Sequence, residues 1–330
     1  MIINTRAHAR FGLVGNPSDG YYGKTIAVIL KNFAAEVTLY ETPELEIVAG
    51  QEDTPRYVSL ADLTEDVALN GYYGGVRLVK ATVSRFVRKF LRERKPGELR
   101  NFTVRYKTNI PRQVGLAGSS AIITATTRAL CRFYDVHVDR QAMPTFVLEV
   151  ETKELNIAAG LQDRVIQTYE GAVYMDFDRR TVEETGHGRY EPLDTSLLPP
   201  LFVAYRTDVA ELSTVTHTDL RTRFDMGDAT VVDGMAECAR LAERARELLL
   251  AGKGSEIGEL LDRNFDARRS MCEIDPRDLE MIEIGRKYGA HPKFSGSGGA
   301  VVGIYPGDEA CAAMTAELKE LNCEVIRPRS

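Results

Sequence analysis

Apolar and polar residues alternate over the first ~60 residues of the chain, in the short period-two stretches that are typical of β-strands. A glycine-rich turn at residues 16–23 and prolines at positions 43 and 55 interrupt this alternation. The pattern therefore predicts short strands at residues 11–15, 25–30, 34–40 and 45–49.

Helical periodicity replaces the alternation from residue 75, where apolar residues recur every three or four positions with basic residues between them. The same spacing predicts helices at residues 75–94, 143–155, 229–250, 257–272, 276–288 and 308–321. Further strands are predicted at residues 101–107, 171–177, 201–205, 300–305 and 324–327. The polar stretch at residues 179–200 is interpreted as a connection between two domains.

The order of these elements, strand-rich at first and then helices mixed with strands, indicates an α+β protein rather than a doubly wound parallel sheet. A chain of 330 residues, of which 44% are hydrophobic, is long enough for about two domains. We expect these domains to span residues 1–195 and 196–330.

The segment Pro111–Ala121 combines glycines and hydroxyl side chains at the start of an apolar helical pattern. Because a predicted strand precedes it, the backbone N–H groups of a helix start would point into the loop, where the helix dipole also favours an anion. Gly115 and Gly118 allow a bulky ligand to approach, and Ser119 and Ser120 add hydroxyls that can bind phosphate oxygens or a hard cation. The segment lacks the Gly-Lys-Ser/Thr of a Walker A loop, and taken alone it also fits an ordinary turn with a serine N-cap.

Three motifs, in order along the chain, resemble the signatures of the GHMP small-molecule kinases. They lie at Arg10–Asp19, Pro111–Ala121 and Lys293–Val302, and the second has one residue more than the family's pattern before Ser-Ser-Ala. The resemblance spans essentially the whole chain. Within the superfamily it is nearest to the branch that acts on glucuronate, through residues 15–19, 70–78, 108–113 and 160–165.

This resemblance implies an N-terminal domain like the second domain of ribosomal protein S5 and a ferredoxin-like C-terminal domain, with the active site in the cleft between them. The implied reaction is an ATP- and Mg²⁺-dependent transfer of the γ-phosphoryl group to the anomeric hydroxyl of D-glucuronate. Two alternatives stay open. One is a kinase of a neutral hexose or a heptose phosphate, and the other is a non-catalytic sensor that binds sugar and nucleotide.

The resemblance also assigns roles to single residues. Asp163 matches the family's general base, which accepts or orients the proton of the acceptor hydroxyl. Arg10 matches a cation that lies against this base and the phosphoryl group, where it would lower the pKa of the base and stabilise developing charge. Asp19 matches a carboxylate that hydrogen-bonds sugar hydroxyls.

One position departs from the superfamily, because Arg164 stands where most members have glutamine after the catalytic aspartate. A uronate carries a carboxylate that a neutral sugar lacks, and a buried carboxylate is best held by a bidentate arginine. We therefore expect Arg164 to bind the substrate, with Lys24 and Arg112 as alternative partners for the carboxylate.

For the nucleotide, the resemblance implies a metal site shared by a serine hydroxyl and a carboxylate. Ser120 matches the hydroxyl, and Glu151, 12 residues before Asp163, is the expected carboxylate, with Glu154 as the alternative. The expected phosphate cradle comprises Pro111, Gly115, Leu116, Ala117, Gly118, Ser119, Ser120 and Ala121.

The net charge of −6 gives no electrostatic reason to bind nucleic acid or an anionic membrane. The resemblance implies a sugar acid and ATP as partners, with a homodimer left open. The five cysteines are widely spaced and include no Cys-x-x-Cys pair, which favours a reducing cytoplasm over a disulfide framework or a metal site. The N-terminus lacks the apolar core of a signal peptide, and no apolar run approaches the ~20 residues of a membrane-spanning helix.

Overall fold

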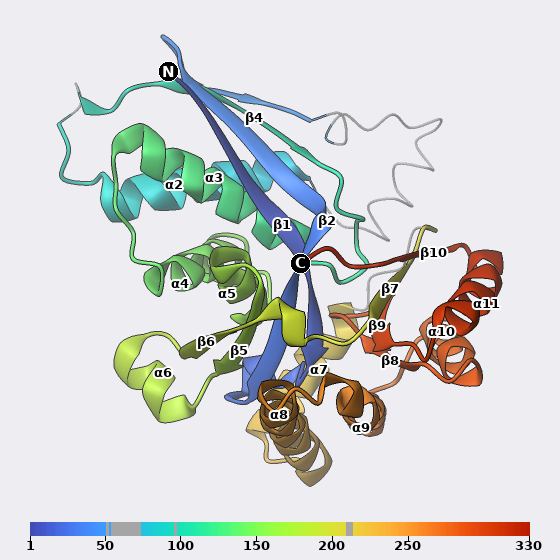
Figure 1. The fold of residues 1–330 in the computed structure, drawn as a ribbon. Coiled ribbons are helices and arrows are strands. Elements are labelled where there is room, and N and C mark those ends of the chain that lie inside the picture. The colour runs from blue at the N-terminus through green and yellow to red at the C-terminus, as the bar shows by residue number, and fades with distance from the viewer. Residues whose placement is uncertain (51–52, 54–73, 96–97, 209–213) are drawn as a thin grey trace.

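The computed structural model describes residues 1–50, 53, 74–95, 98–208 and 214–330, and each half of the chain contains one β-sheet (Figure 1). The strands of the first sheet are β1 (Ile2–Val14), β2 (Lys24–Glu41), β3 (Glu46–Val48), β4 (Phe102–Thr108), β5 (Ala172–Asp176) and β6 (Arg189–Leu193). Those of the second are β7 (Leu201–Arg206), β8 (His291–Phe294), β9 (Ala300–Ile304) and β10 (Cys323–Ile326). Pro55, which interrupts the alternating pattern, and residues 70–73 of the motif at 70–78 lie outside the described residues.

Ten described helices accompany these sheets. They are α2 (Gly75–Phe90), α3 (Gly118–Tyr134), α4 (Ala142–Glu149), α5 (Gln162–Tyr169), α6 (Arg179–Thr185), α7 (Thr214–Asp225), α8 (Ala229–Leu250), α9 (Gly258–Met271), α10 (Pro276–Lys287) and α11 (Asp308–Glu320). In the first half, α3 and α5 pack against β1 and β2, and α2 packs against α3 (Figure 1). None of the described helices combines the length and the apolarity needed to cross a lipid bilayer.

The long strand β2 organises the first sheet. One edge pairs with β1 over nearly its whole length, and the other edge pairs first with β5, through Lys24–Val28, and then with β4, through Ala35–Glu41. In the gap between these partners the C-terminal segment docks on β2. The Lys31 N–H donates to the Arg329 carbonyl at 2.7 Å, and the Arg329 N–H donates to the Asn32 side chain at 2.8 Å. The two strands predicted at 25–30 and 34–40 are therefore one strand, whose polar middle is paired by the end of the chain.

The second sheet has the strand order β10-β7-β9-β8, and all of its neighbouring strands are antiparallel. Helices follow β7, and α11 lies between β9 and β10 in the sequence, which is the ferredoxin-like arrangement. The predicted α+β fold is confirmed. The predicted domain boundary at residues 195/196 lies between β6 and β7 and stays a prediction.

The two halves share one hydrophobic core. It extends from Phe11 and Phe133 in the first half to Val203 in β7 and Leu249 in α8. At ~1.5–3 kcal/mol for each large apolar side chain that is fully buried, this shared core couples the two sheets strongly. The cleft between them therefore has walls whose relative positions are set by packing.

The connection predicted at residues 179–200 is wrong in part, because α6 and β6 lie within it and β6 pairs with β5. The sequence pattern does not predict β6, because this strand lies at the edge of the sheet, where polar residues and Pro192 are tolerated. The helix predicted at 143–155 also differs, since α4 ends at Glu149 and a π-helical turn, Val150–Glu154, follows it. Such turns are frequent at functional sites, and this one carries Glu151.

Candidate active site

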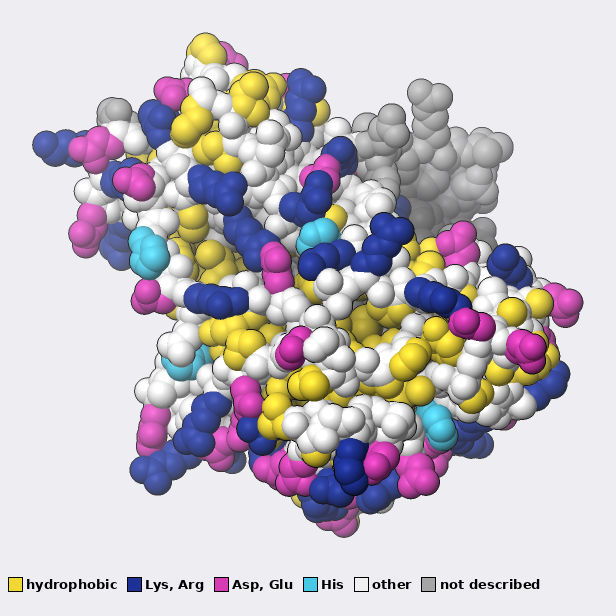
Figure 2. Space-filling model, viewed as in Figure 1, with side chains coloured by type: hydrophobic (Ala, Val, Ile, Leu, Met, Phe, Trp, Pro, Cys, Tyr) yellow, Lys and Arg dark blue, Asp and Glu magenta, His cyan; other side chains and the backbone are white. Residues whose placement is uncertain are grey.

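A cleft of about 700 Å³ lies where the two halves meet. Four segments far apart in the sequence line it: the turn after β1, the loop before α3, the start of α5 and the glycine-rich loop after β8. On the face of the molecule shown in Figure 2, basic and acidic side chains are interspersed, in keeping with the small net charge of −6. Charge for binding an anion must then come from a few groups inside the cleft.

The loop before α3 has the backbone conformation of an anion cradle. Gln113, Gly115 and Ala117 all have positive φ values, of 59°, 68° and 63°, and α3 begins directly afterwards at Gly118. Alternation of left-handed residues with ordinary ones turns successive N–H groups toward one side, and the helix N-terminus adds its dipole. Of the predicted cradle residues, those that line the cleft are Pro111, Gly115, Leu116, Ala117, Gly118 and Ser119, whereas Ser120 and Ala121 are fully buried behind it.

The glycine-rich loop of the second half lies directly on this cradle. A Cβ atom at Gly115 would be 2.9 Å from the Ser297 nitrogen, and one at Gly296 would overlap the Gly115 carbonyl oxygen. The buried Arg268 holds the loop by donating to the Gly296 carbonyl at 2.6 Å and to the Ser297 carbonyl at 2.7 Å. Asp278 also holds it, by accepting from the Gly299 N–H at 2.9 Å. The sequence offers no signal for either residue, because an arginine and an aspartate in predicted helices normally lie on solvated faces.

Close backbone contact between the two loops predicts that Gly296→Ala is damaging. The added methyl group must push the loop away from Gly115, so we expect kcat/KM for ATP to fall by roughly tenfold or more, with ~1–3 kcal/mol of lost stability. Steady-state kinetics and thermal denaturation measure both effects. Gly307→Ala is the matched control, because its Cβ meets no atom within 4 Å. Equal kinetics of the two variants would contradict this account of the loop.

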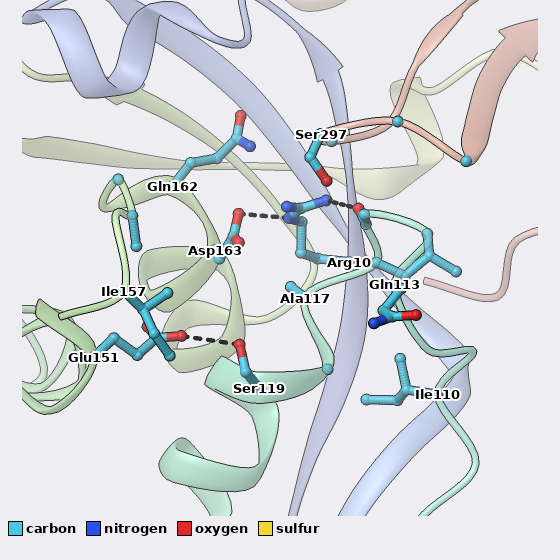
Figure 3. A pocket seen from close by; sticks show the side chains of 18 of the residues that line it. Arg10, Ile110, Gln113, Ala117, Ser119, Glu151, Ile157, Gln162, Asp163 and Ser297 are labelled. Carbon is cyan, nitrogen blue, oxygen red and sulfur yellow. Dashed lines mark hydrogen bonds and ion pairs between the residues drawn. The ribbon is translucent and has the colours of Figure 1, made fainter. Parts of the chain in front are cut away.

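Asp163 and Arg10, which lie in different elements, form the central pair of the site (Figure 3). Asp163 lies in the first turn of α5, and its Oδ1 accepts from the Arg10 Nε at 2.6 Å. The Arg10 Nη1 donates to the carbonyls of Gly115 and Ser295, at 2.6 and 3.0 Å. Because Arg10 is only 5% exposed, these three contacts fix its orientation between the aspartate and both loops.

Burial and two neighbouring arginines set the charge state of Asp163. Burial alone would raise the pKa of Asp163, but the guanidinium groups of Arg10 and Arg164 outweigh it and hold the pKa below its usual range. The carboxylate therefore stays ionised at neutral pH. An ionised oxygen in a cleft, held by a fixed cation, can orient and accept the proton of a hydroxyl group.

Arg164 is engaged by the protein on all three of its nitrogens. Nε and Nη2 both donate to Glu151 Oε2, the former at 2.6 Å, while Nη1 donates to the Gly160 carbonyl at 2.7 Å and lies 3.3 Å from Asp163 Oδ2. The side chain is buried. This geometry favours a role in holding Asp163 and Glu151 in place over the predicted role in binding a substrate carboxylate.

Glu151 is fully buried at the bottom of the cleft, and burial raises its pKa against the opposing effect of Arg164. Its Oε1 accepts from the Ser119 hydroxyl at 3.0 Å (Figure 3). The Ser120 hydroxyl instead donates to the Ala117 carbonyl at 3.2 Å, so the structure does not bring Ser120 and Glu151 together. The alternative carboxylate, Glu154, faces away and forms ion pairs with Arg85 and Arg88 of α2.

The oxygens of Glu151 and Ser119 suit a hard cation such as Mg²⁺, which is commonly held by one or two protein oxygens together with phosphates of the substrate. Among the described residues, no group of three or more histidine, cysteine or acidic side chains is arranged to hold a metal ion.

Asp19, the predicted sugar ligand, lies in the short turn after β1 and lines the cleft beside Gly160. Burial and the nearby Asp163 raise the pKa of Asp19 to about 6, although Arg10 partly opposes the rise. The turn is anchored by Lys293, whose buried side-chain nitrogen donates to the Gly12 carbonyl at 3.0 Å and to Asn16 Oδ1 at 2.5 Å. Lys293, which the third motif contains, thus ties the turn that carries Asp19 to the second sheet.

Comparison with known proteins agrees with this arrangement. Residues 77–171 match the GHMP kinases N terminal domain. Glucuronokinase 1 of Arabidopsis thaliana is 43% identical over 312 residues, which cover 92% of this chain and 85% of the relative. Probable glucuronokinase 2 of the same plant is 42% identical over 314 residues, with the same coverage of 92% and 85%. The structure of Lactococcus lactis galactokinase complexed with galactose has a TM-score of 0.78 at 15% identity, over 99% of this chain and 93% of that chain, and so shares the fold.

The relatives of the chain and its fold are those of a small-molecule phosphotransferase. With more than four residues in ten identical over most of both chains, the protein belongs to the glucuronokinase family within the GHMP kinase superfamily. The resemblance seen in the three sequence motifs is thereby confirmed.

Proposed function

We propose that this protein is an ATP-dependent sugar kinase that phosphorylates the anomeric hydroxyl of D-glucuronate to give glucuronate 1-phosphate. The observation that carries the substrate is the 43% identity, over 92% of the chain, to a protein named glucuronokinase 1. The chemistry is supported independently by the pairing of Asp163 and Arg10 at 2.6 Å beside the phosphate cradle.

In this proposal each residue of the site acts on a different part of the transfer. Asp163 orients the anomeric hydroxyl and accepts its proton as the phosphoryl group arrives, and Arg10 stabilises the charge on the transferring group. The N–H groups of the cradle, up to the start of α3 at Gly118, hold the phosphates of ATP. Ser119 and Glu151 would hold Mg²⁺, which when bound neutralises phosphate charge and aligns the phosphates for transfer. Asp19 accepts hydrogen bonds from sugar hydroxyls.

A comparison of kcat/KM for glucuronate, galacturonate, glucose and galactose, with the product identified by phosphorus NMR, tests this function. We expect glucuronate to be preferred strongly, because a neutral sugar has no carboxylate with which to form the ion pair that a pocket for a sugar acid provides. Equal or better turnover of glucose would replace this function with that of a neutral hexose kinase. Binding of sugar and nucleotide without turnover would identify a sensor.

The raised pKa of Asp19 predicts a pH dependence. The ionised carboxylate accepts hydrogen bonds from the sugar, so protonation as the pH falls through about 6 should lower kcat/KM for the sugar by about tenfold per pH unit. Asp163, whose pKa is lowered, stays ionised throughout this range. The Asp19→Asn variant should have a lower kcat/KM and lack the break near pH 6. If the break persists in that variant, another group causes it.

A cytoplasmic location is also proposed. Its support is that Cys131, Cys238, Cys272, Cys311 and Cys323 are all free thiols in the structure, as expected for a protein kept in a reducing compartment.

A further inference from the structure

A uronate brings one more negative charge into a site that already holds several. Around the reacting group, the guanidinium groups of Arg10 and Arg164 face the carboxylates of Asp163, Glu151 and Asp19, all at the same cleft. With Asp19 ionised, two cations therefore stand against three anions before any substrate is bound. Asp19 lines the end of the cleft at which the sugar is proposed to bind, here called the sugar end. The substrate carboxylate needs a further cation near this end.

The described cations elsewhere in the cleft are committed to other partners. Arg10 and Arg164 are bonded to Asp163 and Glu151, as described above. Arg206 lies in the second sheet, between the carboxylates of Asp208 at 3.1 Å and Asp278 at 3.5 Å. Arg112, the other partner expected from the sequence, lies in the loop before α3 and also has a partner within the protein. Lys24, one of the partners expected from the sequence, is not part of the lining and pairs with Glu243 at 2.7 Å.

Arg221 of α7 remains, and it lies at the sugar end of the cleft. It lines the cleft together with Asp19, Gly20 and Tyr21, and its Nη1 donates to the Gly20 carbonyl at 3.2 Å. The guanidinium also lies over the Tyr21 ring, 5.9 Å from its centroid. Arg221 thus contacts Gly20, the residue that follows Asp19 in the sequence. Its guanidinium therefore lies near the carboxylate that is predicted to bind the sugar hydroxyls.

The present carboxylate partner of Arg221 is easily exchanged. Its Nε donates to Asp225 at 2.9 Å, one helical turn away, and the two side chains are 49% and 55% exposed. An exposed i,i+4 ion pair of this kind contributes only ~0.3–0.5 kcal/mol. A carboxylate inside the cleft, shielded from water, would compete well for the same guanidinium, whose five N–H donors suit bidentate binding.

We propose that Arg221 binds the carboxylate of the uronate substrate and is the residue that determines specificity for a sugar acid. The carboxylate of a hexuronate and its anomeric hydroxyl are attached to the two carbons that flank the ring oxygen. One sugar can therefore reach Asp163 with its hydroxyl while its carboxylate lies against Arg221, above Tyr21. This inference rests on the proposed function. It assigns recognition of the substrate carboxylate to α7, in the second half of the chain.

The test compares glucuronate with its neutral amide, glucuronamide, on the wild-type enzyme and on the Arg221→Gln variant. We expect Arg221→Gln to lower kcat/KM for glucuronate by about 10- to 100-fold, mainly through KM, and to leave kcat/KM for glucuronamide within about twofold. Arg221→Lys should retain part of the preference, because it keeps the charge and loses the fork. Since Arg221 is about half exposed, the variants are expected to fold.

Arg179→Gln is the matched control. Arg179 lies over the neighbouring Tyr22 ring at 5.3 Å, is 69% exposed and is not part of the lining of the cleft, so its replacement should change neither substrate. Equal losses for glucuronate and glucuronamide in Arg221→Gln, or no loss at all, would overturn the assignment while leaving the proposed function intact. A wild-type enzyme with no preference for glucuronate over glucuronamide would overturn the role of Arg221, and failure to phosphorylate either would overturn the proposed function itself.

Discussion

Replacement of Asp163 by asparagine is expected to lower kcat by about 10²- to 10⁴-fold, the range usually lost with a general base. The amide keeps the size of the side chain and one acceptor oxygen for the Arg10 Nε, so the contact that now measures 2.6 Å need not be lost. It cannot take up the proton of the anomeric hydroxyl. We therefore expect the folded variant to bind glucuronate and ATP with affinities within a few-fold of the wild type.

Single-turnover kinetics and isothermal titration calorimetry separate these two effects. Asp233→Asn, at an exposed position on α8, is the matched control for a lost carboxylate and should keep full activity. If Asp163→Asn instead loses affinity for both substrates and keeps its turnover, the aspartate holds the structure of the cleft and another group receives the proton.

Arg164→Gln is expected to lower turnover of every sugar by a similar factor, roughly 10- to 100-fold, rather than to change the choice of sugar. Its removal leaves Glu151 fully buried without the cation that now neutralises it, and Asp163 without one of its two guanidinium partners. Breaking one side of a buried ion pair costs ~3–5 kcal/mol of stability. With an unfolding entropy of about 2 cal/mol/K per residue, that loss lowers the melting temperature by roughly 4–7 °C.

The double variant Glu151→Gln/Arg164→Gln separates stability from catalysis. Two amides in place of the buried pair leave no unpaired charge, so the melting temperature should recover toward the wild-type value and the two single effects should be strongly non-additive. Activity should stay low, because Glu151 is also the proposed metal ligand. A selective loss of glucuronate turnover in Arg164→Gln would instead restore the role that the sequence suggested for this arginine.

Most of the helices, and the glycine-rich segments that form the cradle, could be predicted because their signals are local. Periodicity placed α8 at residues 229–250, and the glycines at 115 and 296 were recognised from the motifs that contain them. Strands were harder, since the pairing of Lys31 with the C-terminal segment cannot be seen in the residues around it. For the same reason β6 was not predicted. It is a polar edge strand, and only its pairing with β5 identifies it as a strand.

Within the cleft, the sequence predicted which residues lie close together better than which way their side chains point. Two adjacent serines precede Ala121, and only the start of α3 at Gly118 decides that Ser119 faces Glu151 while Ser120 faces back to Ala117. Arg164 was assigned to the substrate because it follows Asp163, but the first turn of α5 directs it to Glu151. Arg268 and Arg221 could not be found from the sequence, because each contacts a segment that is distant along the chain. Arg268 holds Gly296 and Ser297 within the second half, and Arg221 contacts Gly20 in the first half.

The docking of Arg329 on the middle of β2 bears on how the chain reaches this structure during synthesis. Lys31 leaves the ribosome about 300 residues before its partner, which is a delay of roughly 15–60 s at 5–20 residues per second. For that time β2, the longest of the described strands, has a gap between β5 and β4 on the side opposite β1, and such an unpaired stretch can pair with other chains. Contacts this distant in sequence also slow folding. We therefore expect nascent chains to need protection at residues 31–33 until the final segment emerges, and chains shortened before residue 327 to aggregate more readily than they lose helical structure.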